Sequence, residues 1–230
     1  MTIPWTDHPL TGLDLETTGP DPMTARIVSA CIVSRAVDGH EATNWLLDPG
    51  IEIPLEATAI HGITTAAAQL NGLDYALGYA DLRNRLERAW ALGHIVVAYN
   101  ASYDMTVIDQ QGRRLGYRTL VCGPIADPYV IDRELDRYRR GKRTLTVTCD
   151  HYGVILGAAH NAAHDASAAV ELTRILAQYY PAELARLTAP QLMTAQSAWH
   201  HDRQTDFAAW LRRSGKDASD VNGEWPLRTA

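Results

Sequence analysis

Four acidic residues and one histidine in this chain are spaced in a way that suits metal-ion chemistry. Asp14 and Glu16 lie near the start, Asp104 lies mid-chain, and His160 stands five residues before Asp165. Hard divalent cations take oxygen ligands and are commonly held by a few carboxylates together with substrate phosphates. Two such ions can activate a water and neutralise the leaving oxygen in a displacement at phosphorus. The residues therefore predict two divalent ions, Mg²⁺ or Mn²⁺.

The spacing places these residues on common faces. In residues 13–16 (LDLE) apolar and acidic residues alternate, so in a β-strand Asp14 and Glu16 would share one face. His160 and Asp165 can converge if the histidine lies in a loop and Asp165 lies in the first turns of the next helix. Each pattern alone would also fit a solvated strand face, a helix cap or a surface loop. Their order along the chain favours one shared site.

The segments around these residues resemble a known family, the DEDD-type 3′ to 5′ exonucleases. The likeness is to the histidine-containing branch that includes the proofreading epsilon subunit of bacterial replicative DNA polymerase, and it covers about residues 5–180. Residues 13–19 (LDLETTG), 97–104 (VAYNASYD) and 159–166 (AHNAAHDA) are similar to the three exonuclease motifs. Residues 59–64 (AIHGIT) are similar to a segment common in epsilon-like members.

The resemblance implies a ligand set for the two ions. Asp14, Glu16 and Asp165 would hold the catalytic ion, and Asp14 would also touch the second ion. Asp104 would support that second ion directly or through water. The residues expected to contact the terminal nucleotide all lie in or beside these motifs. They are Leu15, Thr17, Thr18, His61, Tyr99, Asn100 and Tyr103.

The resemblance also implies a general base. A histidine titrates near neutral pH and can accept a proton from the attacking water. The family places this residue five positions before the last aspartate, which is His160. His164 is the competing candidate, but a residue adjacent to Asp165 in a helix points about 100° away from it. A sister branch has Tyr four positions before that aspartate, where this chain has Asn161, so the tyrosine type does not fit.

The expected activity is removal of nucleoside monophosphates from a 3′ end, with single-stranded or frayed DNA favoured over RNA as the partner. An RNA-directed enzyme of the same superfamily is the main alternative, because contacts to the 2′-OH cannot be placed from one sequence. A catalytically silent module that binds a polymerase is the alternative from another class. A DNA polymerase is a further candidate partner in either case.

Composition sets broader limits. The chain has 230 residues, 46% of them hydrophobic, and its formal net charge is −6. The negative balance argues against tight non-specific duplex binding, which favours a basic surface. No stretch is long and apolar enough for a membrane span, and residues 1–7 do not read as a signal peptide, so a cytoplasmic location is expected. Cys31, Cys122 and Cys149 suggest buried free thiols rather than a zinc site.

The hydropathy pattern predicts an α/β fold with a mixed central sheet flanked by helices, and the resemblance makes it ribonuclease H-like. Expected strands cover residues 9–16, 26–35, 42–47, 94–98 and 118–127. Expected helices cover residues 81–92, 102–115, 144–152, 162–180 and 191–213. An exonuclease domain over residues 1–180 and a C-terminal helical extension over 181–230 follow from this pattern.

Two segments outside the motifs carry open alternatives. The basic run at residues 133–143 reads either as a solubilising loop or as a contact for a nucleic acid strand. The extension reads either as an appendage that packs on the core or as a docking arm. Within it, residues 200–202 (HHD) are expected to form a solvated helix face rather than a metal site.

Overall fold

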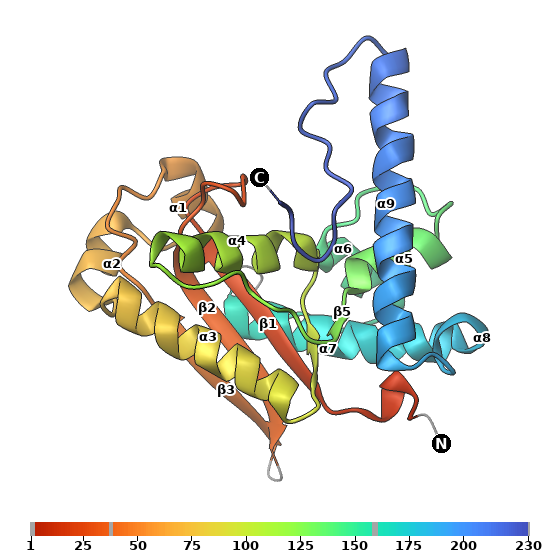
Figure 1. The fold of residues 1–230 in the computed structure, drawn as a ribbon, viewed down its shortest axis with the longest axis horizontal. Helices are drawn as coiled ribbons and strands as arrows, with labels where there is room; N and C mark the ends of the chain where they lie inside the picture. Colours follow the sequence, from red (N-terminus) through yellow and green to blue (C-terminus); the bar gives the residue numbers. More distant parts are fainter. Residues whose placement is uncertain (1–2, 37–38, 158–160, 230) are drawn as a thin grey trace.

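The computed structural model describes residues 3–36, 39–157 and 161–229. A five-stranded sheet has the order β3-β2-β1-β4-β5 (Figure 1). Strands β1 (Leu10–Thr17), β2 (Ile27–Ala36) and β3 (Gly39–Leu46) are antiparallel neighbours, whereas β4 (Ile95–Val97) runs parallel to β1 and β5 (Ile125–Ala126) runs parallel to β4. The predicted α/β architecture with a mixed sheet is confirmed.

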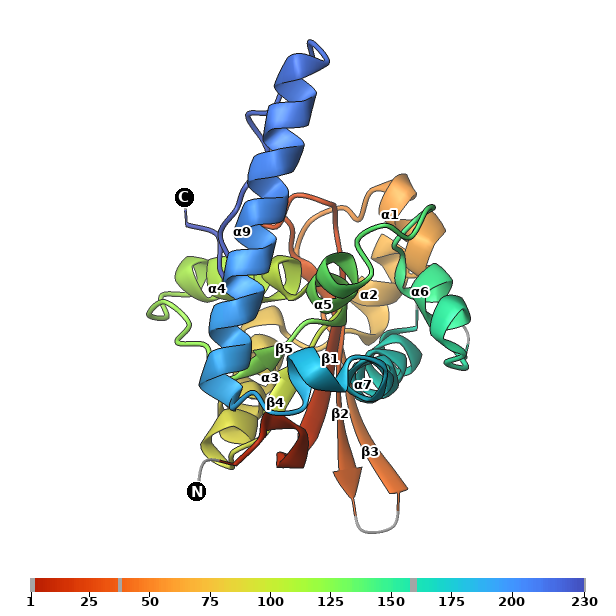
Figure 2. The same ribbon diagram turned by 90° about the vertical axis from the view of Figure 1, so that its right-hand side faces the viewer.

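Helices cover both faces of this sheet. Helices α3 (Tyr75–Ala91) and α4 (Ala101–Arg114) pack on one face, and α7 (Ala162–Tyr179) packs on the other, against β1 and β2 (Figures 1 and 2). The remaining helices lie around the sheet: α1 (Leu55–His61), α2 (Thr65–Asn71), α5 (Pro128–Leu135), α6 (Leu145–Tyr152), α8 (Pro181–Leu184) and α9 (Ala189–Arg213). In the described part of the chain, none of these helices has the length and apolar character of a membrane span.

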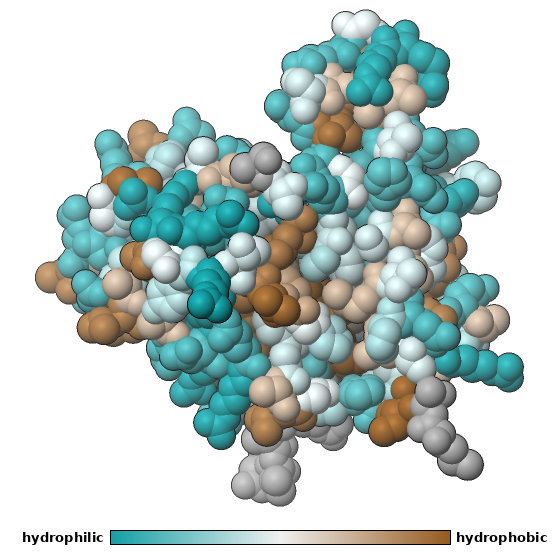
Figure 3. Space-filling view, viewed as in Figure 1, coloured by the Kyte–Doolittle hydropathy of each residue, from teal (hydrophilic) through white to brown (hydrophobic). Residues whose placement is uncertain are grey.

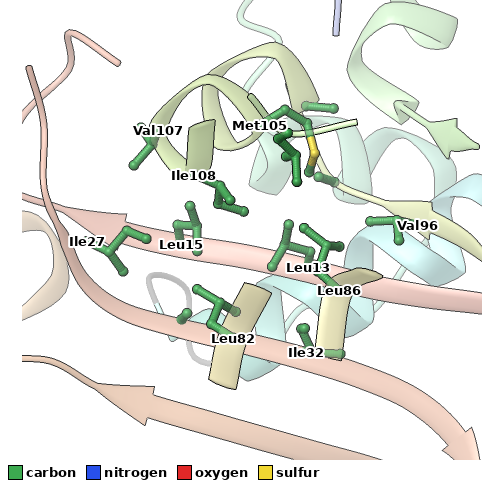
Figure 4. Close-up of a cluster of buried hydrophobic side chains, with 14 of the residues drawn as sticks. Leu13, Leu15, Ile27, Ile32, Leu82, Leu86, Val96, Met105, Val107 and Ile108 are labelled. Atoms are coloured by element: carbon green, nitrogen blue, oxygen red, sulfur yellow. The ribbon is translucent and has the colours of Figure 1, made fainter. Parts of the chain in front are cut away.

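The core explains the orientation of β1. Leu13 and Leu15 are buried on the face toward α3 and α4, where they meet Leu82, Leu86 and Met105 (Figure 4). Burying a leucine side chain contributes about 1.5–3 kcal/mol. Because successive strand residues point to opposite faces, this burial turns Asp14 and Glu16 toward the other side of the sheet.

The region before α5 differs from the sequence prediction. Only Ile125–Ala126 of the expected strand at 118–127 forms a strand, and α5 follows at once. The Asp127 carboxylate caps α5 by accepting hydrogen bonds from the amides of Tyr129 and Val130, with Pro128 in the first helical turn. Asp followed by Pro is a helix start, and this signal outweighs the apolar pattern that suggested a longer strand.

The C-terminal extension contacts the sheet and α4. Helix α9 packs against α5 and β5, and the fully buried Gln196 accepts a hydrogen bond from the Asp127 amide at 2.6 Å. The tail after α9 returns along that helix to α4, where the Arg228 amide donates to Thr106 Oγ1 (Figure 1). Apolar residues gather in a strip beside this tail (Figure 3). These contacts give residues 181–229 internal packing partners on the core.

A close approach between β1 and α7 yields the first prediction. A Cβ at Gly12 would lie 2.5 Å from the Ala166 carbonyl oxygen and 3.0 Å from Val170 Cγ2. Both neighbours belong to a packed helix, so Gly12→Ala should push α7 from the sheet and cost about 1–3 kcal/mol of unfolding free energy. Urea denaturation measures this loss.

Gly19→Ala is the matched control, because nothing lies within 4 Å of a Cβ at Gly19. The urea midpoint of Gly19→Ala should stay near that of the unsubstituted protein. Equal urea midpoints for Gly12→Ala and Gly19→Ala would show that the packing of α7 on β1 does not depend on the absence of a side chain at Gly12.

Candidate active site

The acidic residues of β1 lie on the face predicted for them. Along β1, Leu13 and Leu15 are buried whereas Asp14 and Glu16 are half-buried, which is the expected alternation. The pairing of β1 with β2 shifts register between Glu16 and Thr17. Such a bulge re-aims side chains at the end of a strand and is frequent beside active sites. The two carboxylates therefore project from the last regular part of β1.

Asp165 joins these carboxylates from the first turn of α7. The Asn161 side chain caps the helix by accepting from the amides of Ala163 and His164. One carboxylate oxygen from each of Asp14, Glu16 and Asp165 lies within 4.8 Å of the other two. This spacing is small enough for a single cation to touch all three. Sequence positions about 150 residues apart thus meet at one point.

Asp104 lies at the start of α4, the helix that follows β4. Strand β4 pairs with β1 only over Leu10, Thr11 and Gly12, and the chain then turns at Asn100 into α4, which carries Asp104 in its first turn. Asn100 makes this turn in the left-handed conformation, with φ of 66°. That region is sparsely used by residues other than glycine, although Asn tolerates it better than most. Asp104 is 5% exposed and is not one of the three clustered residues.

The electrostatics of the site oppose ionisation of the acids. Burial raises the pKa of Asp14 well above its usual value, and the charges of Asp104, Glu16 and Asp165 raise it further. Burial also raises the pKa of Asp104, with the nearby Asp127 and Glu16 adding to the effect. Burial and the Asp165 charge raise the pKa of Glu16 to about 7. Several like charges sharing a site cannot all ionise without a compensating charge.

The residues fit a divalent cation. The donor set is carboxylate oxygen alone, which suits Mg²⁺ or Mn²⁺ better than softer metals. Three donors converge within 4.8 Å, and a bound cation would remove the repulsion that raises their pKa values. The site therefore has both the ligands and an electrostatic deficit that a divalent ion would satisfy.

Three residues predicted to contact the substrate also have internal hydrogen-bond partners. The Tyr103 hydroxyl donates to the Gly19 carbonyl at 2.5 Å and bonds Thr17 Oγ1, while Thr18 Oγ1 accepts from the Arg26 amide at 2.9 Å. These bonds fix the turn after β1 against α4. The Leu15 side chain is 8% exposed and belongs to the core, so the expected contact from that side chain is not available and only its backbone stays a candidate.

The other predicted contacts are more dispersed. The Tyr99 hydroxyl donates to the Arg143 carbonyl at 2.7 Å and bonds Thr148 Oγ1, which ties this residue to the segment before α6. The Asn100 amide donates to Asp127 at 2.9 Å, and its half-buried side chain stays a candidate. His61 ends α1, with its ring Nδ1 accepting from the Ile63 amide.

The predicted base, His160, lies outside the described residues. Its competitor His164 is exposed on α7, whereas Asp165 beside it is buried, in agreement with their different directions on the helix. A Cβ on Gly157 would lie 2.8 Å from His164 Nδ1, so this ring packs against the segment before α7.

Asp127 is a site residue that the sequence prediction missed. Besides capping α5, its carboxylate accepts from the amides of Asn100 and Ala101 and from Trp225 Nε1. Burial raises the pKa of Asp127 to about 6 in spite of these bonds. The residue joins the turn before Asp104 to the C-terminal tail. The Asp-Pro pair is the signal for this helix cap in the sequence, whereas the apolar pattern predicts a strand that ends at Asp127.

The basic run at 133–143 is not a simple loop. Arg139 and Arg143 form ion pairs at 2.6 Å with the fully buried Asp132, and Arg137 pairs with Glu134. A buried carboxylate needs such partners because its desolvation is costly. Part of the run is therefore structural.

The expectation for residues 200–202 was wrong at one position. His200 is 4% exposed because α9 turns this residue toward the core, and burial lowers its pKa. Cys31 and Cys149 are buried free thiols as predicted, while Cys122 is half-buried.

Comparison with known proteins identifies the family. Residues 11–173 match the family model RNase_T, described as "Exonuclease". This match spans well over half of the chain, so the protein belongs to this exonuclease family. The resemblance to DEDD-type exonucleases inferred from the three motifs is confirmed.

Individual relatives agree with this assignment. The chain is 34% identical over 112 residues to "Uncharacterized exonuclease CP81" of Escherichia phage 186, covering 49% of this chain and 53% of that protein. It is 31% identical over 107 residues to a DNA polymerase III subunit epsilon-like protein of Rhodobacter capsulatus, covering 45% of this chain and 14% of that protein. The matched regions thus span about half or less of these relatives.

Solved structures support the fold. Exonuclease I of E. coli in complex with a dT13 oligonucleotide superimposes with a TM-score of 0.65 at 18% identity, covering 76% of this chain and 42% of that chain. At this identity the likeness concerns the fold, and the predicted ribonuclease H-like fold is confirmed.

The raised carboxylate pKa values predict how stability depends on pH. Between pH 4.5 and about 7, Glu16 is ionised in the unfolded chain but protonated in the metal-free fold. The folded state then binds more protons, so its stability from this group falls as pH rises through the window. Thermal denaturation in EDTA should show this fall, and Glu16→Gln should make it shallower, because the other carboxyls with raised pKa values still contribute.

Added Mn²⁺ should raise the thermal midpoint more above this window than near its lower end, because ligand carboxylates must lose their protons to bind. Equal shifts at about pH 5 and about pH 8 would contradict binding at these carboxylates.

Proposed function

We propose that this protein is a metal-dependent 3′ to 5′ exonuclease that releases nucleoside monophosphates from DNA ends. The observation that carries the proposal is the convergence of Asp14, Glu16 and Asp165 within 4.8 Å in a chain of an exonuclease family. Phosphodiester hydrolysis requires charge compensation at the phosphate, and a carboxylate cluster supplies it through bound cations.

The proposed roles rest on the motif resemblance, and the convergence of the carboxylates of Asp14, Glu16 and Asp165 supports them. Asp14, Glu16 and Asp165 would hold the first divalent ion, and Asp14 and Asp104 would hold the second. When bound, such ions polarise the phosphate and lower the pKa of a coordinated water. His160 accepts the proton of the attacking water, as the sequence motif implies. The proposed contacts to the terminal nucleotide are the backbone of Leu15 and the side chains of Thr17, Thr18, His61, Tyr99, Asn100 and Tyr103.

Single-stranded DNA or a frayed end is the proposed substrate. Support comes from the relatives: the E. coli exonuclease I structure holds a dT13 oligonucleotide, and the Rhodobacter relative is named for a polymerase subunit. An RNA substrate is the second candidate within the superfamily. A silent scaffold is disfavoured because all four acids are present at the expected positions.

We also propose the division of the chain into an exonuclease domain at residues 1–180 and a helical extension at 181–230. The extension bonds Asp127 through Gln196 and Trp225, so it supports the turn that leads to Asp104. A DNA polymerase is a candidate partner for this protein.

Loss of a metal ligand should abolish hydrolysis. With 5′-labelled single-stranded DNA and RNA in Mg²⁺, the unsubstituted protein should give a ladder that shortens from the 3′ end, faster on DNA. Asp14→Asn should slow this by at least about 10³-fold, because catalysis depends on the bound cation.

Glu183→Gln, which removes an exposed carboxylate on α8, is the matched control and should keep the full rate. No degradation of either nucleic acid by the unsubstituted protein, in Mn²⁺ as well, would overturn the proposed activity. A faster ladder on RNA would move the substrate to RNA.

His160 and His164 can be separated by a pair of variants. His160→Ala should lower kcat by about 10²–10⁴-fold at neutral pH and leave Mn²⁺ affinity unchanged, because a general base acts on the water and not on the ion. The rate should recover as hydroxide increases with pH. His164→Ala should retain the rate. The opposite result would assign the base to His164.

A further inference from the structure

A cationic pocket of about 400 Å³ lies between α5, α9 and the loop that joins α5 to α6. The charged side chains that line it are all positive: Arg133, Arg137, Arg139, Lys142, Arg143 and Arg203. The protein as a whole carries a net charge of −6. Positive charge in this acidic protein is therefore concentrated at one concave surface.

Part of this charge is held rigidly. Arg139 and Arg143 both contact the buried Asp132 carboxylate at 2.6 Å, and Arg143 also donates to the Asp136 and Arg139 carbonyls. Arg139 also pairs with the Asp136 carboxylate at 3.1 Å, so these two arginines are balanced by two acids and the uncompensated charge of the pocket comes from its other cations. These bonds fix the wall of the pocket without a bound ligand, which lowers the entropy cost of binding.

Three further cations are not committed to an acid. Among the ion pairs of the described residues, none includes Arg133, Lys142 or Arg203. The Arg133 guanidinium lies over the Tyr129 ring, 5.0 Å from its centroid. Burial and the charges of Arg133 and Arg143 lower the pKa of Arg203. An anion between these guanidiniums would relieve their repulsion.

An aromatic pocket of about 360 Å³ adjoins the cationic one. The two share Tyr129, Arg133 and Arg203, and the second adds Trp199 and Phe207 from α9. Phe207 is 41% exposed, so much of its ring is accessible. We call the combined surface, defined by Tyr129, Arg133, Trp199, Arg203 and Phe207, the α5–α9 groove. Cations beside exposed aromatic rings are the pattern that binds single-stranded nucleic acid.

The groove is connected to the acidic site through α5. Asp127 holds both the first amides of α5 and the amides of Asn100 and Ala101 at the start of α4. The rings of Tyr129 and Tyr99 also meet, with centroids 5.5 Å apart. Helix α5 has eight residues and is about 12 Å long. Figure 2 shows α5 beside α9.

We propose that the α5–α9 groove binds the single strand on the 5′ side of the 3′-terminal nucleotide. A phosphate lies between Arg133 and Arg203, and a neighbouring base stacks on the exposed Phe207 ring. This inference rests on the proposed exonuclease function and adds a second binding position to it. Oligonucleotides that reach the groove bind more tightly than a dinucleotide, which reaches only the acidic site.

The test compares binding of short and long strands in EDTA, where hydrolysis does not occur. Fluorescence anisotropy is measured with 5′-labelled oligo(dT) of about 16 nucleotides and with a labelled dinucleotide. The double variant Arg133→Gln/Arg203→Gln should weaken the long strand about tenfold or more. It should also lower the salt slope by about 0.7, which is the value for one lost phosphate contact.

Two further variants test whether the effect is specific to the groove. Arg212→Gln removes an exposed charge from the end of the same helix and should keep the affinity and nearly the full slope. Phe207→Ala should weaken the long strand about fivefold or more with little change of slope, because stacking is not ionic. The dinucleotide should bind all four proteins equally.

The outcomes separate the two proposals. Unchanged binding of the long strand by both groove variants would overturn the groove and leave the exonuclease proposal intact. Groove-dependent binding without any hydrolysis in Mg²⁺ or Mn²⁺ would keep the groove and overturn the activity. If an oligoglutamate peptide needed Arg133 and Arg203 while oligo(dT) did not, the groove would be a protein-docking surface and the proposal would be wrong.

Discussion

The close packing of α7 on β1 is the contact on which the site depends. The absence of a side chain at Gly12 allows the Ala166 carbonyl to approach the strand, and Asp165 precedes Ala166 by one residue. Asp14 and Glu16 lie on the same face of β1 as Gly12, so this approach brings the helix carboxylate to theirs. The buried carboxylates then repel one another, and the packing of Leu13 and Leu15 on the opposite face holds the strand in place.

The Asp127 carboxylate links the site to the rest of the molecule through its hydrogen bonds. This carboxylate organises the start of α4, the start of α5 and the C-terminal tail, three segments far apart in sequence. Within α5, the buried Asp132 anchors Arg139 and Arg143 of the following loop.

The features predicted correctly from the sequence are those that depend on short-range patterns of residues. The alternation of Leu13 to Glu16, the helix start before Asp165 and the three early strands follow from period and capping, and they are present in the structure. Helices α1 and α2 were not predicted, and β5 is much shorter than the strand expected at residues 118–127, because tertiary pairing decides such brief elements. The internal hydrogen bonds of Thr17, Thr18 and Tyr103 could not be predicted from the sequence either, since they join residues up to 86 positions apart.

The central claim is that divalent ions bind at the carboxylates where β1 and α7 meet. Anomalous diffraction from crystals grown with Mn²⁺ tests it most directly, because the signal locates the metal without assumption about activity. The account predicts a strong peak in contact with Asp14, Glu16 and Asp165, with a second ion between Asp14 and Asp104. Full Mn²⁺ occupancy elsewhere, with no peak at these residues, would contradict it.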